Sequence, residues 1–275
     1  MPLPTPGFAL ADLTIRDLGT LEDYDAAVAL QDETWGHGFA ERVPGAILRV
    51  SQKIGGVTAG AFTPHHRLVG FVFGMTGVRD GQLVHWSDML AVLPEARGIG
   101  LGERLKQHQA DTVRRLGVTR MYWTADPLVA RNAHFNINHL GAAPHEYVEN
   151  MYGENTGSVL HGAMPTDRFV YHWALDAAGA HRAGLPADGD DRLPSAITIG
   201  RDGTPVAVST VDARHLRVPL PDDLTVVQAA SSDRALAWRI AVRAAFTRLH
   251  DGWRVTRFVR SAAGALPYYV LSAPL

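Results

Sequence analysis

The chain has 275 residues, of which 46% are hydrophobic, so it is long enough for one large domain or two modest ones. Its 26 Lys and Arg residues are balanced by 28 Asp and Glu residues. This net charge of −2 provides no basic excess for binding a nucleic-acid backbone. The absence of cysteine excludes disulfides, thiolate zinc sites and a covalent cysteine–acyl intermediate.

No segment is typical of a membrane or secreted protein. No run approaches about 18 consecutive apolar residues, the length that a transmembrane helix needs. Residues 1–6 lack the basic start and the apolar core of a signal peptide. We therefore expect a cytoplasmic protein with no membrane partner and no nucleic-acid partner.

The first part of the chain mixes strands and helices. Apolar periodicity predicts, in chain order, a strand over 13–18, helices over 17–35 and 44–54, strands over 57–62, 67–75 and 84–93, a helix over 101–116, a strand over 121–125, a helix over 130–140, and strands over 145–151 and 168–175. Gly55, Gly117 and Gly141 follow predicted elements as stop signals. These elements form a predicted first domain over residues 1–176.

A change of composition separates the tail from this domain. Residues 177–194 are small, polar and rich in turn formers, which predicts a linker. Residues 195–275 then predict a small α+β unit, with strands over 197–199 and 205–209, a helix over 232–249, and strands over 254–259 and 268–272. Such a unit has a thin core, so we expect it to pack on the first domain or on a second subunit, and we predict a homodimer.

The segment from Arg97 to Gly102 is the strongest functional signal. It lies between a predicted strand and a predicted helix and contains Gly98, Gly100 and Gly102. Glycine allows a backbone to approach a ligand closely, and the N–H groups at a helix start favour a phosphate. A plain tight turn is the alternative, because the chain has 27 glycines. The position before a helix favours a pyrophosphate-binding loop.

The spacing of Arg97, Gly100 and Gly102 is R-x-x-G-x-G, preceded by the strand and turn at 90–94. This pattern resembles the acetyl-CoA signature of the Gcn5-related N-acetyltransferase (GNAT) superfamily, in an uncharacterised branch with a C-terminal extension. The element order over about residues 12–176 is similar to that superfamily as well. The resemblance implies an α/β (α+β) fold, with a mixed, mostly antiparallel central sheet flanked by helices.

The resemblance also implies a binding mode for acetyl-CoA as co-substrate. The backbone of Leu90, Ala91 and Val92 would bind the pantetheine, in a gap between the fourth and fifth strands. Amides from Gly98, Ile99, Gly100, Leu101 and Gly102 would hold the pyrophosphate, and Arg97 would stabilise the turn or approach a phosphate. Asn132 would bond the pantetheine, although it could equally satisfy a helix start.

The groups that move protons are open alternatives. His85 and Asp88 are the candidate bases; they lie three residues apart, so they face opposite sides of a regular strand unless a bulge intervenes. Many members of that superfamily carry, at the position of Ile137, a tyrosine that acts as the acid for the leaving thiolate. Isoleucine cannot donate a proton. Tyr147 and Tyr152 are the candidate acids, with a core role as the commoner alternative.

Two classes of function fit these residues. The first is an acyl-CoA-dependent N-acyltransferase, with acetyl as the expected acyl group, acting by direct attack of an amine in a ternary complex. The acceptor would be a small-molecule or peptide amine that the sequence does not identify. The second is a non-catalytic acyl-CoA-binding or sensing module. The adjacent His65 and His66 have no evident third ligand, so no metal is expected.

Overall fold

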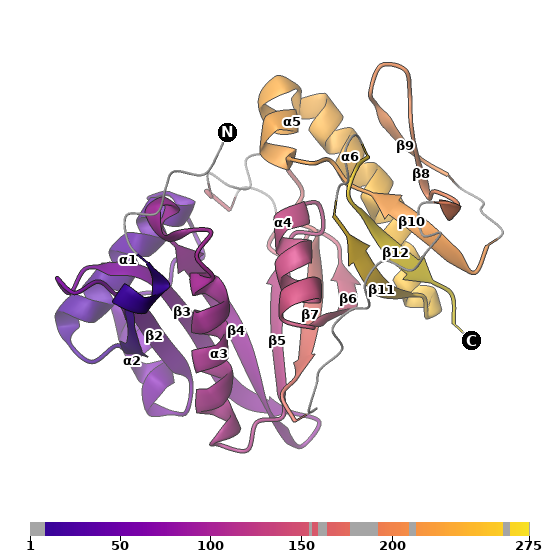
Figure 1. Ribbon diagram of the computed structural model, residues 1–275. Coiled ribbons are helices and arrows are strands. Elements are labelled where there is room, and N and C mark those ends of the chain that lie inside the picture. Colours follow the sequence, from indigo (N-terminus) through magenta and orange to yellow (C-terminus); the bar gives the residue numbers. More distant parts are fainter. Residues whose placement is uncertain are drawn as a thin grey trace. The chain divides into compact units, whose positions relative to one another are not determined.

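The computed structural model describes residues 9–153, 156–158, 164–176, 192–208, 213–260 and 265–274 (Figure 1). Within these residues, one sheet has seven strands in the order β1-β2-β3-β4-β5-β7-β6, and two further sheets have the orders β10-β12-β11 and β8-β9. The β4–β5 pair is parallel, whereas the pairs β1–β2, β2–β3, β3–β4 and β6–β7 are antiparallel. The predicted α/β class with a mixed, mostly antiparallel sheet is confirmed.

The chain forms two compact units. The first consists of Met1–Trp123, Asn155–Gly162 and Ala174–Ala178, and the second of Thr124–Glu154, Ala163–Trp173 and Gly179–Leu275. The predicted linker over 177–194 lies mostly outside the described residues.

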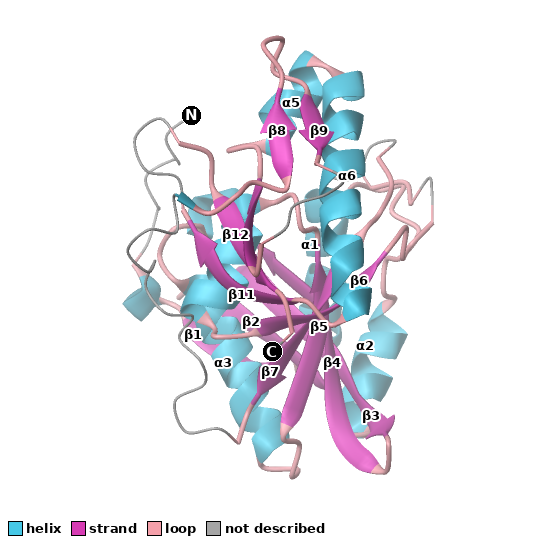
Figure 2. Ribbon diagram, turned by 90° about the vertical axis from the view of Figure 1, so that its right-hand side faces the viewer, coloured by secondary structure: helices cyan, strands magenta, loops and turns pink. Residues whose placement is uncertain are grey.

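The first unit is a sheet with helices on both faces. Its elements are η1 (Leu10–Asp12), β1 (Thr14–Asp17), α1 (Leu21–Trp35), α2 (Gly45–Lys53), β2 (Val57–Phe62), β3 (Leu68–Arg79), β4 (Gln82–Val92), η2 (Pro94–Ala96), α3 (Leu101–Arg114) and most of β5 (Arg120–Ala125). Figures 1 and 2 show α3 on one face of strands β2 to β4 and α2 on the other. Both faces of β2 are therefore buried over its whole length.

Local signals explain where these helices begin. Thr20 caps α1 by accepting from the Asp23 N–H, and Asp23 in turn accepts from the Thr20 N–H. This capping box starts α1 four residues later than the predicted helix over 17–35. Pro44 stands before α2, where its missing N–H costs nothing.

The second unit joins the tail to the strands that precede it. Its elements are the end of β5, α4 (Ala130–Ala133), η3 (His134–His139), β6 (Ala143–Val148), β7 (Arg168–Ala174), β8 (Ile197–Ile199), β9 (Pro205–Ala207), β10 (His215–Pro219), α5 (Leu224–Ala230), α6 (Ser232–Phe246), η5 (Thr247–Asp251), β11 (Arg254–Val259) and β12 (Tyr268–Ser272). Figure 2 shows the β8–β9 hairpin beside the long helix α6, and the two are in contact.

Aromatic rings form the core of the second unit. The Phe169 ring lies 4.6 Å from that of Phe246 and 5.5 Å from that of Tyr269, and Tyr147 and Phe258 extend the cluster. Their edge-to-face arrangements are the favoured geometry of aromatic pairs. Residues before and after the predicted linker thus share one core, which supplies the packing surface that the thin tail requires.

Candidate functional site

The loop between β4 and α3 contains the predicted phosphate-binding residues. After η2, Gly98 and Gly100 have φ angles of +81° and +84°, which a side chain would strain. Gly100 directly precedes α3, and no side chain caps this end of the helix. A Cβ added at Gly100 would meet nothing closer than Leu10 Cδ2, at 3.9 Å. The loop therefore leaves room for an anion beside the first N–H groups of α3.

Arg97 connects this loop to the preceding strand. Its Nε donates to the carbonyl oxygen of Val92 at 3.0 Å. Val92 is the last residue of β4, so the bond fixes the direction in which the chain leaves the strand. This contact favours the turn-stabilising role of the two that the sequence suggests for Arg97.

The last residues of β4, directly before the glycine loop, pair with a neighbouring strand on one side only. Its parallel pairing with β5 comprises Val84–Arg120, His85–Met121 and Trp86–Tyr122. Its antiparallel pairing with β3 continues to Val92. In the described structure, the predicted pantetheine-binding residues Leu90, Ala91 and Val92 therefore lie where β4 is paired with β3 but not with β5. An extended ligand could bond the main chain there.

Asp88 lies in a β-bulge of β4. Phe73 of β3 pairs with Met89 and Gly74 pairs with Ser87, so Asp88 is the extra residue. Asp88 reaches the surface, whereas Ser87 and Met89 are buried. The protein atoms around its carboxyl group remove part of its hydration and so raise its pKa, a hydrogen bond from Trp86 opposes this, and the charge of Glu41 adds to it. A carboxylate with a raised pKa is a better proton acceptor.

His85 lies inside the unit, with no exposed surface. The hydroxyl of Thr76 donates to the Gly55 carbonyl, so Thr76 Oγ1 accepts from His85 Nδ1–H at 3.0 Å. Nε2 is then a lone-pair acceptor, and it has no partner among the described residues. Burial, followed by the charge of Lys106, lowers the pKa of His85 to about 3. At neutral pH this imidazole is uncharged and weakly basic, so Asp88 is the better placed of the two candidate bases.

The other three candidates belong to the second unit. The Tyr147 hydroxyl donates to Asp167 Oδ2, and burial followed by this bond raises its pKa. The Tyr152 hydroxyl is hydrogen-bonded to Thr124 Oγ1 at 2.8 Å. Asn132 is half-buried on α4, just before the π-type turn η3 that replaces the end of the predicted helix. Their proposed catalytic and binding roles stay predictions, and the contacts of Tyr147 favour a structural role.

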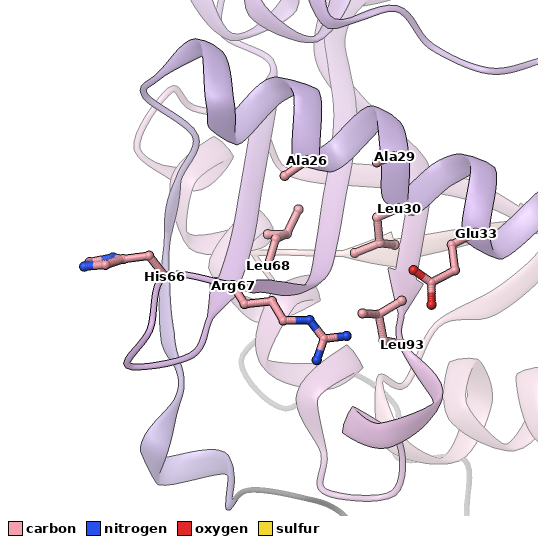
Figure 3. A pocket seen from close by; sticks show the side chains of 8 residues that line it. All are labelled: Ala26, Ala29, Leu30, Glu33, His66, Arg67, Leu68 and Leu93. Carbon is pink, nitrogen blue, oxygen red and sulfur yellow. The ribbon is translucent and has the colours of Figure 1, made fainter.

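A pocket of about 270 Å³ opens beside α1 (Figure 3). Ala26, Ala29, Leu30, Leu68 and Leu93 give it an apolar lining, and Glu33, His66 and Arg67 add polar groups. Arg67 is already paired with Glu95. Leu93 follows Asp88 by five residues, roughly 16 Å along a strand, so this pocket lies away from the bulge.

Sequence reasoning did not identify three buried polar residues, namely Ser87 on β4 and Lys106 and Gln109 on α3. Gly102, Lys106, Gln109 and Val113 follow the i, i+4, i+7, i+11 spacing of one helix face. That spacing is the sequence signal that could have identified Lys106 and Gln109 as buried, because it aligns both with the apolar inner face of α3.

The described residues include neither a helix that could span a membrane nor a group of side chains that could hold a metal ion. No helix there has both the length and the apolar character that crossing a bilayer demands. No group of three or more His, Asp or Glu side chains in the same residues is arranged to hold a metal ion.

Part of the chain is similar to known proteins. Residues 60–136 match the model of the acetyltransferase (GNAT) family. No curated protein matches the sequence. Similar solved structures include the ribosomal-protein-S18-alanine N-acetyltransferase of Escherichia coli (20% identity, 61% of this chain and 96% of that chain, TM-score 0.46), YncA of Salmonella typhimurium with acetyl-CoA (19%, 64% and 98%, 0.48) and Naa50 of Arabidopsis thaliana with a bisubstrate analogue (17%, 59% and 99%, 0.47).

Proposed function

We propose that the chain is an acyl-CoA-dependent N-acyltransferase of the GNAT superfamily, whose family model matches residues 60–136. The observation that carries the proposal is the course of β4. The strand loses its β5 partner after Trp86, bulges at Asp88 and runs into the glycine loop before α3. One edge of β4 thus lacks a strand partner directly before a glycine loop with open space beside Gly100.

We propose that the cofactor runs along the whole of this segment. Amides from Gly98 to Gly102 would hold the diphosphate, where the space beside Gly100 is open. The pantetheine would then run back along Leu90, Ala91 and Val92, bonding their main-chain groups as a further strand would. Asn132 is a further proposed pantetheine ligand, on the strength of the resemblance alone.

The proposed reaction has one covalent exchange. The thioester supplies an activated acyl group. The acceptor nitrogen attacks the thioester carbon, the new C–N bond forms, the C–S bond breaks and the CoA thiolate leaves. Asp88 accepts the proton that the nitrogen loses, and the thiolate is protonated from solvent. A ternary complex is the natural order, because a chain without cysteine cannot form a cysteine–acyl intermediate.

The primary test is binding followed by turnover. Isothermal titration with acetyl-CoA should show a single site, and release of free CoA should be measured against a panel of small-molecule and peptide amines. Release with any amine supports the enzyme and excludes the non-catalytic sensing module, the alternative that the sequence suggested. Tighter binding of ATP than of CoA would contradict both. A cytoplasmic location and a homodimer stay predictions.

Replacing Asp88 by Asn should lower kcat by roughly 100-fold to 10,000-fold, the usual contribution of a general base. The rate of the wild-type protein should fall on the acidic side, as Asp88 is protonated. This fall should occur at higher pH than for an ordinary carboxyl group, because the pKa of Asp88 is raised. The variant should lose the acidic limb of the pH–rate profile while binding CoA normally.

The matched control is Asp80→Asn, in the exposed turn between β3 and β4. Asn tolerates the positive φ of this position, so the control should keep the wild-type profile. If Asp88→Asn keeps both its rate and its acidic limb, another group is the base.

A further inference from the structure

Lys106 is buried where β4 and β5 stop pairing. It is one of only two lysines in the chain and is 2% exposed. Its Nζ donates to Ser87 Oγ at 2.7 Å and lies 3.8 Å from the centre of the Trp123 ring. Ser87 and Trp123 directly follow Trp86 and Tyr122, the last β4–β5 pair. The lysine head group therefore bridges the two strands at the point where they separate.

This lysine has no carboxylate partner. No Asp or Glu of the described residues forms an ion pair with it, and burial lowers its pKa well below the usual value. Burying an ammonium group without a counter-charge is strongly unfavourable. An apolar side chain would fill the same space without that penalty, so the lysine calls for a functional explanation.

Gln109, one turn further along α3, is a second buried polar side chain whose charge or hydrogen-bonding groups are not matched by its surroundings in the described residues. It has no exposed surface, and neither its amide nitrogen nor its amide oxygen has a hydrogen-bond partner among the described residues. Gly74 gives it room, because an added Cβ there would lie 2.7 Å from Gln109 Nε2 and 2.3 Å from His85 Nε2. Unpartnered buried polar groups are uncommon in folded proteins.

We call Ser87, Lys106 and Gln109 the apex cluster. Lys106 Nζ has at least one N–H group beyond the one given to Ser87, the Gln109 amide has two, and the Ser87 hydroxyl keeps its own proton to donate. A carboxylate beside Lys106 would favour the protonated form of the lysine, so the cluster offers several donors and gains a positive charge when such a group binds. A carboxylate, with two oxygens that each accept more than one hydrogen bond, is the complementary group.

The direction of the cofactor brings an acyl chain to this cluster, an argument that rests on the proposed function. With the diphosphate at the glycine loop, the pantetheine runs toward Asp88, roughly 16 Å back along β4 from Leu93. An acyl group extends beyond the thioester toward the next residue, Ser87. We propose that the apex cluster binds the far end of the acyl chain, so that the preferred donor is a short acyl-CoA whose acyl group ends in a carboxylate.

The reaction itself is unchanged by this proposal. The same C–S bond breaks and the same C–N bond forms, while the terminal carboxylate keeps its charge and is not consumed. Ordered water bound to Lys106 and Gln109 is the competing explanation of the cluster, because water would satisfy the same donors without selecting a donor substrate. The two explanations differ in what they predict for acyl-CoA affinity.

The test uses the full chain and four probes: CoA, acetyl-CoA, butyryl-CoA and succinyl-CoA. Butyryl and succinyl groups have the same number of carbons and differ in their terminal methyl or carboxylate. By isothermal titration, the wild-type protein should bind succinyl-CoA roughly tenfold or more tightly than butyryl-CoA. Lys106→Met, which keeps the length and removes the charge, should abolish this preference while leaving CoA affinity unchanged.

Lys53→Met is the matched control, because Lys53 is the other lysine and is exposed on α2. It should keep the wild-type preference. Gln109→Met provides a second variant should Lys106→Met fail to fold by circular dichroism, and it should weaken the preference. The inference would be overturned if the wild-type protein bound butyryl-CoA and succinyl-CoA equally tightly. It would also be overturned if folded Lys106→Met and Gln109→Met variants kept the preference for succinyl-CoA. Failure to bind CoA itself would instead overturn the proposed function.

Discussion

Replacing Asp167 by Asn should lower the free energy of unfolding by about 3–5 kcal/mol. The Asp167 side chain has no exposed surface and accepts from Arg243 Nε and Nη2, at 2.9 and 2.7 Å, from the Tyr147 hydroxyl and from the Asn150 N–H. An amide keeps only one acceptor oxygen and turns two N–H groups toward these donors. The guanidinium of Arg243 then keeps only its longer ion pair with Glu149, at 3.4 Å. Chemical denaturation followed by circular dichroism measures the change.

The control for this change is Asp111→Asn. Asp111 also pairs with an arginine, Arg114 at 2.6 Å, but both side chains are substantially exposed, so the loss should be below about 1 kcal/mol. Equal losses at the two positions would contradict the importance that we assign to burial.

The same carboxylate gives the stability a defined pH dependence. Loss of hydration tends to raise the pKa of Asp167, but the hydrogen bonds from Arg243, Tyr147 and Asn150 outweigh it and lower the pKa. A group with a lowered folded-state pKa stabilises the protein above its unfolded pKa, and this contribution is lost as the pH falls through the folded value. The difference in free energy of unfolding between wild type and Asp167→Asn should therefore shrink as the pH falls below 3.8, the usual pKa of an aspartate side chain.

Replacing Gly100 and Gly102 together by Val should reduce affinity for acetyl-CoA on the order of a hundredfold, which corresponds to about 2.8 kcal/mol. The φ of +84° at Gly100 disfavours a β-branched residue, and the new side chain would occupy the open space of the loop. Both effects move the main-chain amides from the proposed diphosphate position. Isothermal titration, with thermal melting to confirm folding, measures the outcome.

Gly117→Val separates backbone strain from loss of the site. Gly117 follows the other end of α3, has a φ of +85° and has open space where a Cβ would lie. The free energy of unfolding of this variant should fall by about as much as it falls per substituted glycine in the double variant. Its affinity for acetyl-CoA should stay unchanged. A folded double variant with unchanged affinity would remove the basis of the proposed function.

Local sequence signals were sufficient for most elements. The strands over 57–62, 254–259 and 268–272 have the predicted bounds, because apolar runs and turn residues define them locally. Strand β10 (His215–Pro219) and helix α5 (Leu224–Ala230) were not predicted. Only two of the five β10 residues are buried and no α5 residue is, so neither segment carries a strong apolar pattern. The pairing of β10 with β12 depends on residues about 50 positions away.

The candidate site also has one part that local sequence signals predict and one part that they do not. The glycine loop was predictable, because its geometry depends on a few consecutive residues. The partners of His85 were not, because Thr76, Gly55 and Lys106 come from three other segments and together make it a neutral, weak base. Lys106 was missed because a lysine is ordinarily assigned to the solvent side of a helix.

The aromatic core of the second unit has a consequence for synthesis on the ribosome. Phe169 emerges about 100 residues before Tyr269, yet the two rings lie 5.5 Å apart in one cluster. During translation, Tyr147 and Phe169 therefore keep apolar surface exposed until Tyr269 has left the exit tunnel. Most of the first unit has no such delay, since its sheet through Trp123 is complete far earlier in the chain.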